Sequence, residues 1–261
     1  MSTAPEWLSS RPVAHRGLHS ASSAAGSSAG TVPENTVAAF EAAIGAGFAI
    51  ELDVQLSADD QAVVYHDRDL FRLCGSPDPV RSRTVDQLRD YRISGTDQYP
   101  PSLVETLDYI DGRVPVLVEI KAGLQRNLRA AAAFAALRDY QGEVAVQSFD
   151  PFIVAWFRRN SPSTLRGQLS GSLDDAHNLN PLSRTMMRNL GFNPVSRPHF
   201  VGYEYEFLSP LRARLITQRW PLLVWTITSQ ADLDRVGELG GNGIFEGFIP
   251  RPREGAGRTA Q

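Results

Sequence analysis

Short apolar runs typical of buried strands recur along this chain, and segments with the apolar spacing of helices separate several of them. Such alternation predicts a parallel sheet joined by right-handed crossovers. Eight runs of this kind predict an α/β chain folded as a (β/α)8 TIM barrel. The strand-like runs cover residues 12–15, 48–54, 114–121, 143–149, 164–169, 200–205, 221–228 and 243–246, and the clearest helical segments cover residues 36–46, 124–140, 151–160 and 230–239.

A ninth apolar run, residues 62–66, follows the second strand after a very short link. Such a link joins antiparallel strands, because a parallel return needs about a dozen residues or more. We therefore expect a small hairpin here, followed by an irregular segment rich in Pro, Gly and Arg from residue 67 to about 102. The expected organisation is a single domain over residues 1–250, with an insertion at about 56–108, and a flexible tail at 251–261.

Composition argues against several classes of protein. A chain of 261 residues can form one barrel or two small domains. Its net charge of −3 leaves no surplus of basic residues that would bind nucleic acid or anionic lipid. The single cysteine, Cys74, excludes an intramolecular disulfide framework. No run approaches the roughly 18 apolar residues that span a bilayer, and residues 1–15 lack the features of a secretory signal. We therefore expect a cytoplasmic protein with no nucleic-acid partner and no stable membrane insertion.

Three carboxylates stand where an acidic side chain needs a partner. Glu51 and Asp53 are two residues apart on a strand, so both side chains point to one face near the C-terminal end, which carries the active site in a barrel. Glu119 closes another apolar strand. Like charges in a confined space repel unless a cation or proton lies between them, and three carboxylates suit Mg or Ca. Ordinary ion pairs, with arginines or with Lys121, explain the same residues.

Two histidines, His15 and His66, end the first strand and the hairpin strand. Either one alone fits a hydrogen-bonded structural role. Together they fit acid–base catalysis, because imidazole titrates near neutrality and one ring can accept a proton while the other donates one. Arg16 and Lys121 would supply the cationic donors that phosphate oxygens require, although each alone fits a solvated surface charge.

The order and spacing of these residues resemble the signature of the glycerophosphodiester phosphodiesterase family. The resemblance extends over about residues 13–250 and weakens toward the C-terminus. The motifs that carry it are His15-Arg16-Gly17, Pro33-Glu34-Asn35-Thr36, Glu51-Leu52-Asp53-Val54, His66-Asp67 and Glu119-Ile120-Lys121, with weaker similarity at Gln147-Ser148-Phe149-Asp150 and Val224-Trp225-Thr226.

The resemblance implies a metal-dependent enzyme of lipid and glycerol metabolism. Its reaction would be hydrolysis of a glycerophosphodiester to sn-glycerol 3-phosphate and an alcohol. The attacking group would be water or the glycerol 2-hydroxyl, which gives a cyclic phosphate that water then opens. The sequence leaves open which histidine is the acid and which the base. The implied site consists of Glu51, Asp53 and Glu119 as ligands of one divalent cation, Mg or Ca, of His15 and His66 as acid and base, and of Arg16 and Lys121 as phosphate binders.

Two further residues, Glu34 and Trp225, are candidates for the substrate pocket. Capping of the next helix by Asn35 explains the Pro-Glu-Asn segment equally well, and core packing explains Trp225.

Departures from the family pattern concern substrate access and the pocket rather than the catalytic set. The low-complexity residues 20–30, expected to form a flexible loop, lengthen the first connection, Ile227-Thr228 follow Trp225-Thr226, and Phe245-Glu246 stand where many relatives carry Thr-Asp.

Two other functions fit the same sequence. A lysophospholipase D type activity on lipid phosphodiesters would need an apolar channel, which the irregular insertion would have to supply. A non-catalytic barrel that binds phosphorylated ligands would be favoured if one of the histidines or carboxylates were missing, and all are present. The expected partner is therefore a small-molecule glycerophosphodiester. The sequence leaves the oligomeric state open.

Overall fold

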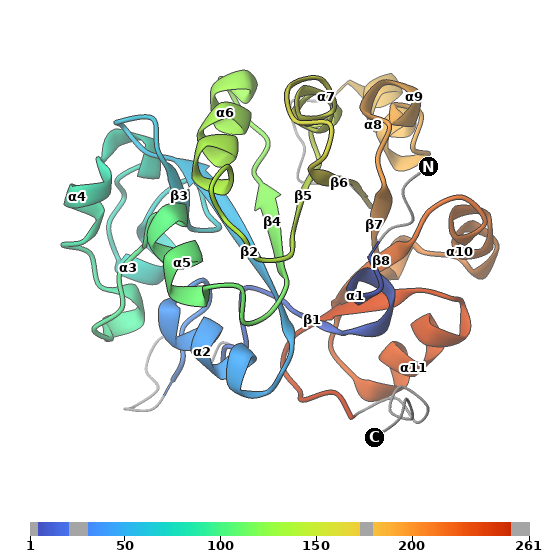
Figure 1. Cartoon of the computed structure of the whole chain (residues 1–261), viewed down its shortest axis with the longest axis horizontal. Helices are drawn as coiled ribbons and strands as arrows, with labels where there is room; N and C mark the ends of the chain where they lie inside the picture. The colour runs from blue at the N-terminus through green and yellow to red at the C-terminus, as the bar shows by residue number, and fades with distance from the viewer. Residues whose placement is uncertain (1–4, 21–30, 173–179, 252–261) are drawn as a thin grey trace.

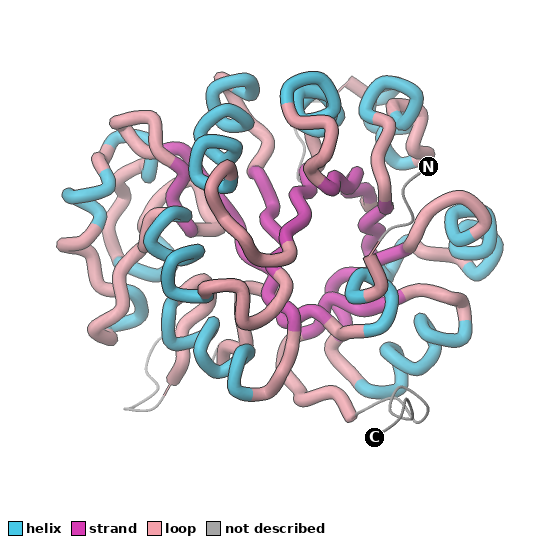
Figure 2. The backbone as a smooth tube through the Cα atoms, viewed as in Figure 1, coloured by secondary structure: helices cyan, strands magenta, loops and turns pink. Residues whose placement is uncertain are grey.

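A closed barrel of parallel strands forms the centre of the molecule. The computed structural model describes residues 5–20, 31–172 and 180–251. In these ranges, eight parallel strands form a ring with helices outside it (Figures 1 and 2), and β1 closes the ring by pairing with both β2 and β9. The predicted (β/α)8 barrel is confirmed. The strands are β1 (Val13–Ala14), β2 (Ala49–Leu56), β3 (Ala62–Val64), β4 (Val116–Ile120), β5 (Val144–Ser148), β6 (Leu165–Ser170), β7 (Phe200–Glu204), β8 (Leu222–Ile227) and β9 (Asn242–Phe245).

The helices begin where short polar side chains cap them. Thr36, Ser102, Asp150 and Ser229 each accept a hydrogen bond from a backbone N–H of the first turn. The four predicted helical segments correspond to α2, α6, α7 and α11. The helices are α1 (Trp7–Ser10), α2 (Val37–Gly45), α3 (Phe71–Cys74), α4 (Val85–Leu88), α5 (Leu103–Ile110), α6 (Arg126–Leu137), α7 (Pro151–Asn160), α8 (Pro181–Arg188), α9 (Asn193–Ser196), α10 (Pro210–Thr217) and α11 (Gln230–Glu238), with 3-10 turns η1 (Val80–Ser82), η2 (Ile93–Gly95) and η3 (Tyr205–Phe207).

The hairpin after the second strand is also confirmed, because β3 pairs antiparallel with β2 with Val54 opposite Val64. The segment that follows carries more structure than the irregular loop expected from its composition. It contains α3, η1, α4 and η2, which lie beside β3 at one side of the barrel (Figure 1). Leu70, Leu88 and Ile93 are buried in a small apolar cluster of its own. This cluster explains how a segment rich in Pro and Gly holds a defined shape.

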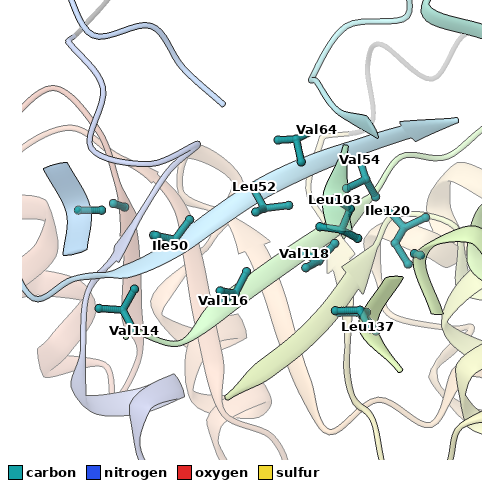
Figure 3. Close-up of a cluster of buried hydrophobic side chains, with 14 of the residues drawn as sticks. Ile50, Leu52, Val54, Val64, Leu103, Val114, Val116, Val118, Ile120 and Leu137 are labelled. Atoms are coloured by element: carbon teal, nitrogen blue, oxygen red, sulfur yellow. The ribbon is translucent and has the colours of Figure 1, made fainter. Parts of the chain in front are cut away.

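Side chains on the strands alternate between the helix-facing core and the barrel interior. On β2, Ile50, Leu52 and Val54 belong to the large core between strands and helices (Figure 3). Glu51 and Asp53 lie between them in sequence and therefore point to the opposite, inner face. The same alternation on β4 places Val116, Val118 and Ile120 in the core and Leu117 and Glu119 inside the barrel.

The barrel interior changes from apolar at one end to polar at the other. Val13, Ala49, Leu117 and other early strand residues form a buried apolar cluster that α1 covers with Trp7 and Leu8. The inner positions two residues further along the strands carry His15, Glu51 and Glu119. Polar groups therefore collect at the C-terminal ends of the strands, the end that carries the active site in barrels of this type.

The expected flexible loop at 20–30 and the tail at 251–261 fall almost entirely outside the described residues. Among the described residues, no helix has both the length and the apolar character needed to cross a membrane.

Candidate active site

Three carboxylates converge at the C-terminal end of the barrel. Glu51 and Asp53 lie on β2 and Glu119 on β4, where Asp53 is directly opposite Glu119 in the parallel pairing. One oxygen of each carboxylate lies within 4.8 Å of the others, and all three residues are buried. Strand register therefore brings together acidic groups that stand far apart in the chain.

Two cationic side chains lie against these carboxylates. Lys121 Nζ is 2.6 Å from Asp53 Oδ1 and 2.7 Å from Glu119 Oε1. Arg16 Nε is 3.3 Å from Asp53 Oδ2, and the backbone N–H of Arg16 donates to Glu51 Oε2 at 2.9 Å. Asp53 is in direct contact with both cations, whereas the hydrogen bond that Glu51 accepts comes from the backbone of Arg16, and Lys121 acts on Glu51 from further away.

The pKa values of Glu51 and Asp53 shift in opposite directions for this reason. Burial and the negative charges of Asp53 and Glu119 raise the pKa of Glu51 well above its ordinary value. Burial also acts to raise the pKa of Asp53, but the charges of Lys121 and Arg16 outweigh it and lower that pKa strongly. An excess of negative charge therefore remains at Glu51, and a proton or a further cation would relieve it.

The donor set matches a hard divalent cation. Its three ligand atoms are carboxylate oxygens, which Mg and Ca prefer over the sulfur and imidazole ligands that softer metals select. A cation between the three carboxylates would remove the repulsion that raises the pKa of Glu51. The residues present therefore fit a divalent metal ion.

His15 lies directly after β1, and its ring is fixed by a residue from the other end of the chain. Its Nδ1 atom is 2.7 Å from Glu246 Oε2, and Glu246 follows β9, the strand that pairs with β1. Burial lowers the pKa of His15, although the hydrogen bond to Glu246 opposes this. The same hydrogen bond lowers the pKa of Glu246. Sequence reasoning missed this partner, and the only signal was the departure from the family pattern at the last strand.

His66 follows the hairpin strand β3 and is held in a similar way. Its Nδ1 atom is 2.6 Å from Asp67 Oδ1, and the second oxygen of Asp67 accepts a hydrogen bond from Arg72 Nε at 2.7 Å. Ionised carboxylates only accept hydrogen bonds, so Nδ1 of each imidazole carries the proton, which leaves Nε2 available. Asp67 belongs to the His66-Asp67 motif of the sequence analysis but had no role assigned there, and Arg72 was not singled out from the sequence.

Residues 34–36 have three separate roles. Glu34 is only 5 % exposed and accepts hydrogen bonds from Arg16 at 2.8 Å and from Arg72 at 2.7 and 2.9 Å. Asn35, in the left-handed region at φ 54°, donates to Asp53 Oδ2 at 2.8 Å and accepts from the Asp53 N–H at 3.2 Å. The interpretation of Asn35 as a helix cap is wrong, because Thr36 caps α2.

Trp225 occupies the inner face of β8, two residues after the buried Leu223 and beside Glu204 of β7. Its ring packs edge-to-face against Phe149 at 5.4 Å between ring centroids. It is only partly buried, so one part of the indole forms apolar packing while another part is accessible. This position at the mouth of the barrel is compatible both with a place in the substrate pocket and with core packing.

Comparison with known proteins identifies the family of this chain. Residues 15–249 match the family model described as the glycerophosphoryl diester phosphodiesterase family. A glycerophosphodiester phosphodiesterase of Bacillus subtilis is 24 % identical, over 90 % of this chain and 83 % of that protein, and one from Caldanaerobacter subterraneus is 25 % identical, over 82 % and 88 %.

Solved structures share the fold. A phosphodiesterase of Oleispira antarctica, in complex with the product sn-glycerol-3-phosphate, superposes with a TM-score of 0.75 at 20 % identity, over 91 % of this chain and 92 % of that chain. A glycerophosphodiester phosphodiesterase from Thermotoga maritima gives a TM-score of 0.67 at 23 % identity, over 91 % and 94 %. Since the family model matches nearly the whole barrel, this chain belongs to the glycerophosphoryl diester phosphodiesterase family.

Proposed function

We propose that this chain hydrolyses glycerophosphodiesters to sn-glycerol 3-phosphate and an alcohol by two-histidine acid–base catalysis at a divalent-metal site. The observation that carries the proposal is the surroundings of Asp53. Lys121 Nζ and Arg16 Nε lie 2.6 and 3.3 Å from its two carboxylate oxygens. The charges of His66 and His15 also act to lower its pKa, so both cations and both histidines lie near one buried carboxylate. This arrangement is what cleavage of a phosphodiester anion requires.

The side chains divide the chemistry between them. Arg16 and Lys121 bind the non-bridging phosphate oxygens and neutralise the charge that grows on them. One imidazole enters the step neutral and accepts the proton of the attacking hydroxyl through Nε2, and the other enters as the imidazolium and gives its Nε2 proton to the departing alkoxide. Glu246 holds His15, and Asp67 holds His66, in the orientation that these transfers need. A divalent cation bound by Glu51, Asp53 and Glu119 would supply Lewis-acid stabilisation of the phosphoryl oxygens.

The finer assignments extend this proposal. Mg or Ca is expected, because the donor set contains only carboxylates. A role in lipid and glycerol metabolism and a cytoplasmic location follow from the resemblance and the composition, and they stay predictions.

Purified protein assayed on glycerophosphocholine and glycerophosphoethanolamine, with Mg, Ca or EDTA, tests the activity. His15→Ala and His66→Ala should each abolish turnover while circular dichroism shows an intact fold. His199→Ala is the matched control, because His199 precedes β7 at the opposite end of the barrel and contacts the Arg166 N–H. Wild-type rates in either His15→Ala or His66→Ala would refute the proton-transfer assignment.

A lysophospholipase D type activity is a second candidate, and exposed apolar side chains after β4 and β5 favour it. Leu124 is 88 % exposed and Phe152 is 40 % exposed, on the segments that follow β4 and β5. Residues 123–128 line an open cavity of about 620 Å³. If this surface binds an acyl chain, Leu124→Ser should raise the KM for lysophosphatidylcholine and leave that for glycerophosphocholine unchanged. Equal effects on both substrates would remove this candidate.

A further inference from the structure

Arg72, on helix α3 of the insertion, contacts two carboxylates from different parts of the chain. Its NH1 and NH2 atoms donate to Glu34 Oε2 and Oε1 at 2.9 and 2.7 Å, and its Nε atom donates to Asp67 Oδ2 at 2.7 Å. All three guanidinium nitrogens are therefore engaged. A planar guanidinium fixes the orientation of each carboxylate that it pairs with, which a lysine ammonium cannot do.

Each of these carboxylates leads directly to a residue of the proposed catalytic site. Asp67 Oδ1 holds His66 Nδ1 at 2.6 Å. Glu34 Oε1 accepts from Arg16 NH1 at 2.8 Å as well as from Arg72. A continuous series of contacts therefore joins the imidazole of His66 to the guanidinium of Arg16 through Arg72.

We propose that Arg72 is a positioning residue, which holds His66 through Asp67 and Arg16 through Glu34 so that the proton donor or acceptor and the phosphate binder keep a fixed relative geometry. This inference rests on the proposed function. The insertion then has a function in the site, since its helix α3 places Arg72 at the mouth of the barrel.

A simpler account would treat Arg72, which is 42 % exposed, as a surface ion pair that only fastens the insertion. Arg83 shows what such a pair looks like. Its NH2 atom lies 2.8 Å from Asp78 and its Nε atom donates to Tyr91, and all three residues belong to the insertion itself. Arg72 instead joins the insertion to Glu34, which is buried and precedes the helix α2 of the barrel. Arg83 therefore provides the matched control.

Steady-state kinetics on glycerophosphocholine separate the two accounts. Arg72→Ala should lower kcat about 100-fold, the order of loss expected when a catalytic group shifts by about 1 Å, and should also raise KM. Arg83→Ala should keep the wild-type kcat and KM even if it unfolds at a lower temperature. Arg72→Lys keeps the positive charge but loses the planar guanidinium, so its kcat should lie between those of the wild type and Arg72→Ala. Added guanidinium ion at a low, non-denaturing concentration should partly restore Arg72→Ala.

Double variants test whether Arg72 acts through its two partners. Asp67→Asn should lower kcat with little change in KM, and Glu34→Gln should chiefly raise KM. Adding Arg72→Ala to Asp67→Asn should lower kcat no further, because the link is already broken. Fully additive losses, or equal kinetics in Arg72→Ala and Arg83→Ala, would overturn the inference.

A readout independent of turnover keeps this inference separate from the proposed function. In ¹⁵N NMR spectra, Arg72→Ala should change the signal of the His66 Nδ1–H group, and Arg83→Ala should leave it unchanged. An unchanged His66 signal in Arg72→Ala would refute positioning through Asp67. Absence of hydrolysis by the wild-type protein would instead refute the proposed function.

Discussion

The Nδ1 atom of His15 lies 2.7 Å from Glu246 Oε2, although 231 positions separate the two residues in the chain. Closure of the barrel creates this contact, because β1 and β9 pair in parallel and the His15 N–H donates to the Phe245 carbonyl at 2.9 Å. The first and last strands therefore build one hydrogen-bonded pair at the mouth of the barrel.

Glu246→Gln should lower kcat about 10- to 100-fold, part of the roughly 10²- to 10⁴-fold that proton transfer contributes. The amide keeps the size of the side chain but loses the charge that orients the His15 imidazole. Glu246→Asp keeps the charge on a shorter side chain and should retain more activity. Steady-state kinetics on glycerophosphocholine measure both, and a wild-type rate in Glu246→Gln would show that His15 needs no such partner.

Glu51→Gln should weaken divalent-ion binding, because it removes one of three converging carboxylates. Isothermal titration calorimetry with Mg and with Ca measures the affinity directly, and EDTA should abolish turnover in the wild-type protein. Glu41→Gln is the matched control, since Glu41 pairs with Arg113 on the outer surface. An affinity unchanged by Glu51→Gln would remove this residue from the ligand set.

Gly17→Ala should destabilise the fold more than Gly47→Ala does. Both glycines have a positive φ, 79° and 74°, so a Cβ costs each about 1–2 kcal/mol in backbone strain. At Gly17 the new Cβ would also lie 2.8 Å from the Cβ of Ala39, whereas at Gly47 it would meet open space. The clash should add about 1–3 kcal/mol. Urea denaturation measures both variants, and equal losses would contradict the close packing at Gly17.

The free energy of unfolding should fall in acid, partly because protonation of Glu34 and Asp67 removes their ion pairs with Arg72. Burial acts to raise the pKa of Glu34 and of Asp67, but hydrogen bonds from Arg72 to Glu34, and from His66 and Arg72 to Asp67, lower both values. The folded protein therefore binds fewer protons than the unfolded chain in mild acid. This stabilisation is present above the unfolded pKa values and is lost as pH falls through the folded ones.

Arg72→Ala should consequently show a smaller loss of unfolding free energy than the wild type between about pH 5 and pH 3. Urea denaturation of the metal-free proteins at several pH values measures the difference. Parallel curves for the two proteins would show that Arg72 does not lower these pKa values.

Much of the barrel was predictable because local patterns encode it. Apolar runs identified the strands, and helical spacing identified four of the helices. The short link after the second strand identified the antiparallel hairpin. Two-residue spacing alone predicts that Glu51 and Asp53 share a face of one strand, since side chains alternate along a strand. These conclusions needed only neighbours in the chain.

Relations between distant segments were decided by the tertiary structure. Register between β2 and β4 sets Asp53 against Glu119, and pairing of β1 with β9 sets His15 against Glu246. The insertion brings Arg72 to Glu34, and Asn35 turns to Asp53 instead of capping a helix. Sequence determined which side chains carry the chemistry, because residue type and strand periodicity are local. The fold decided which of them touch, because ring closure and strand register depend on packing across the whole chain.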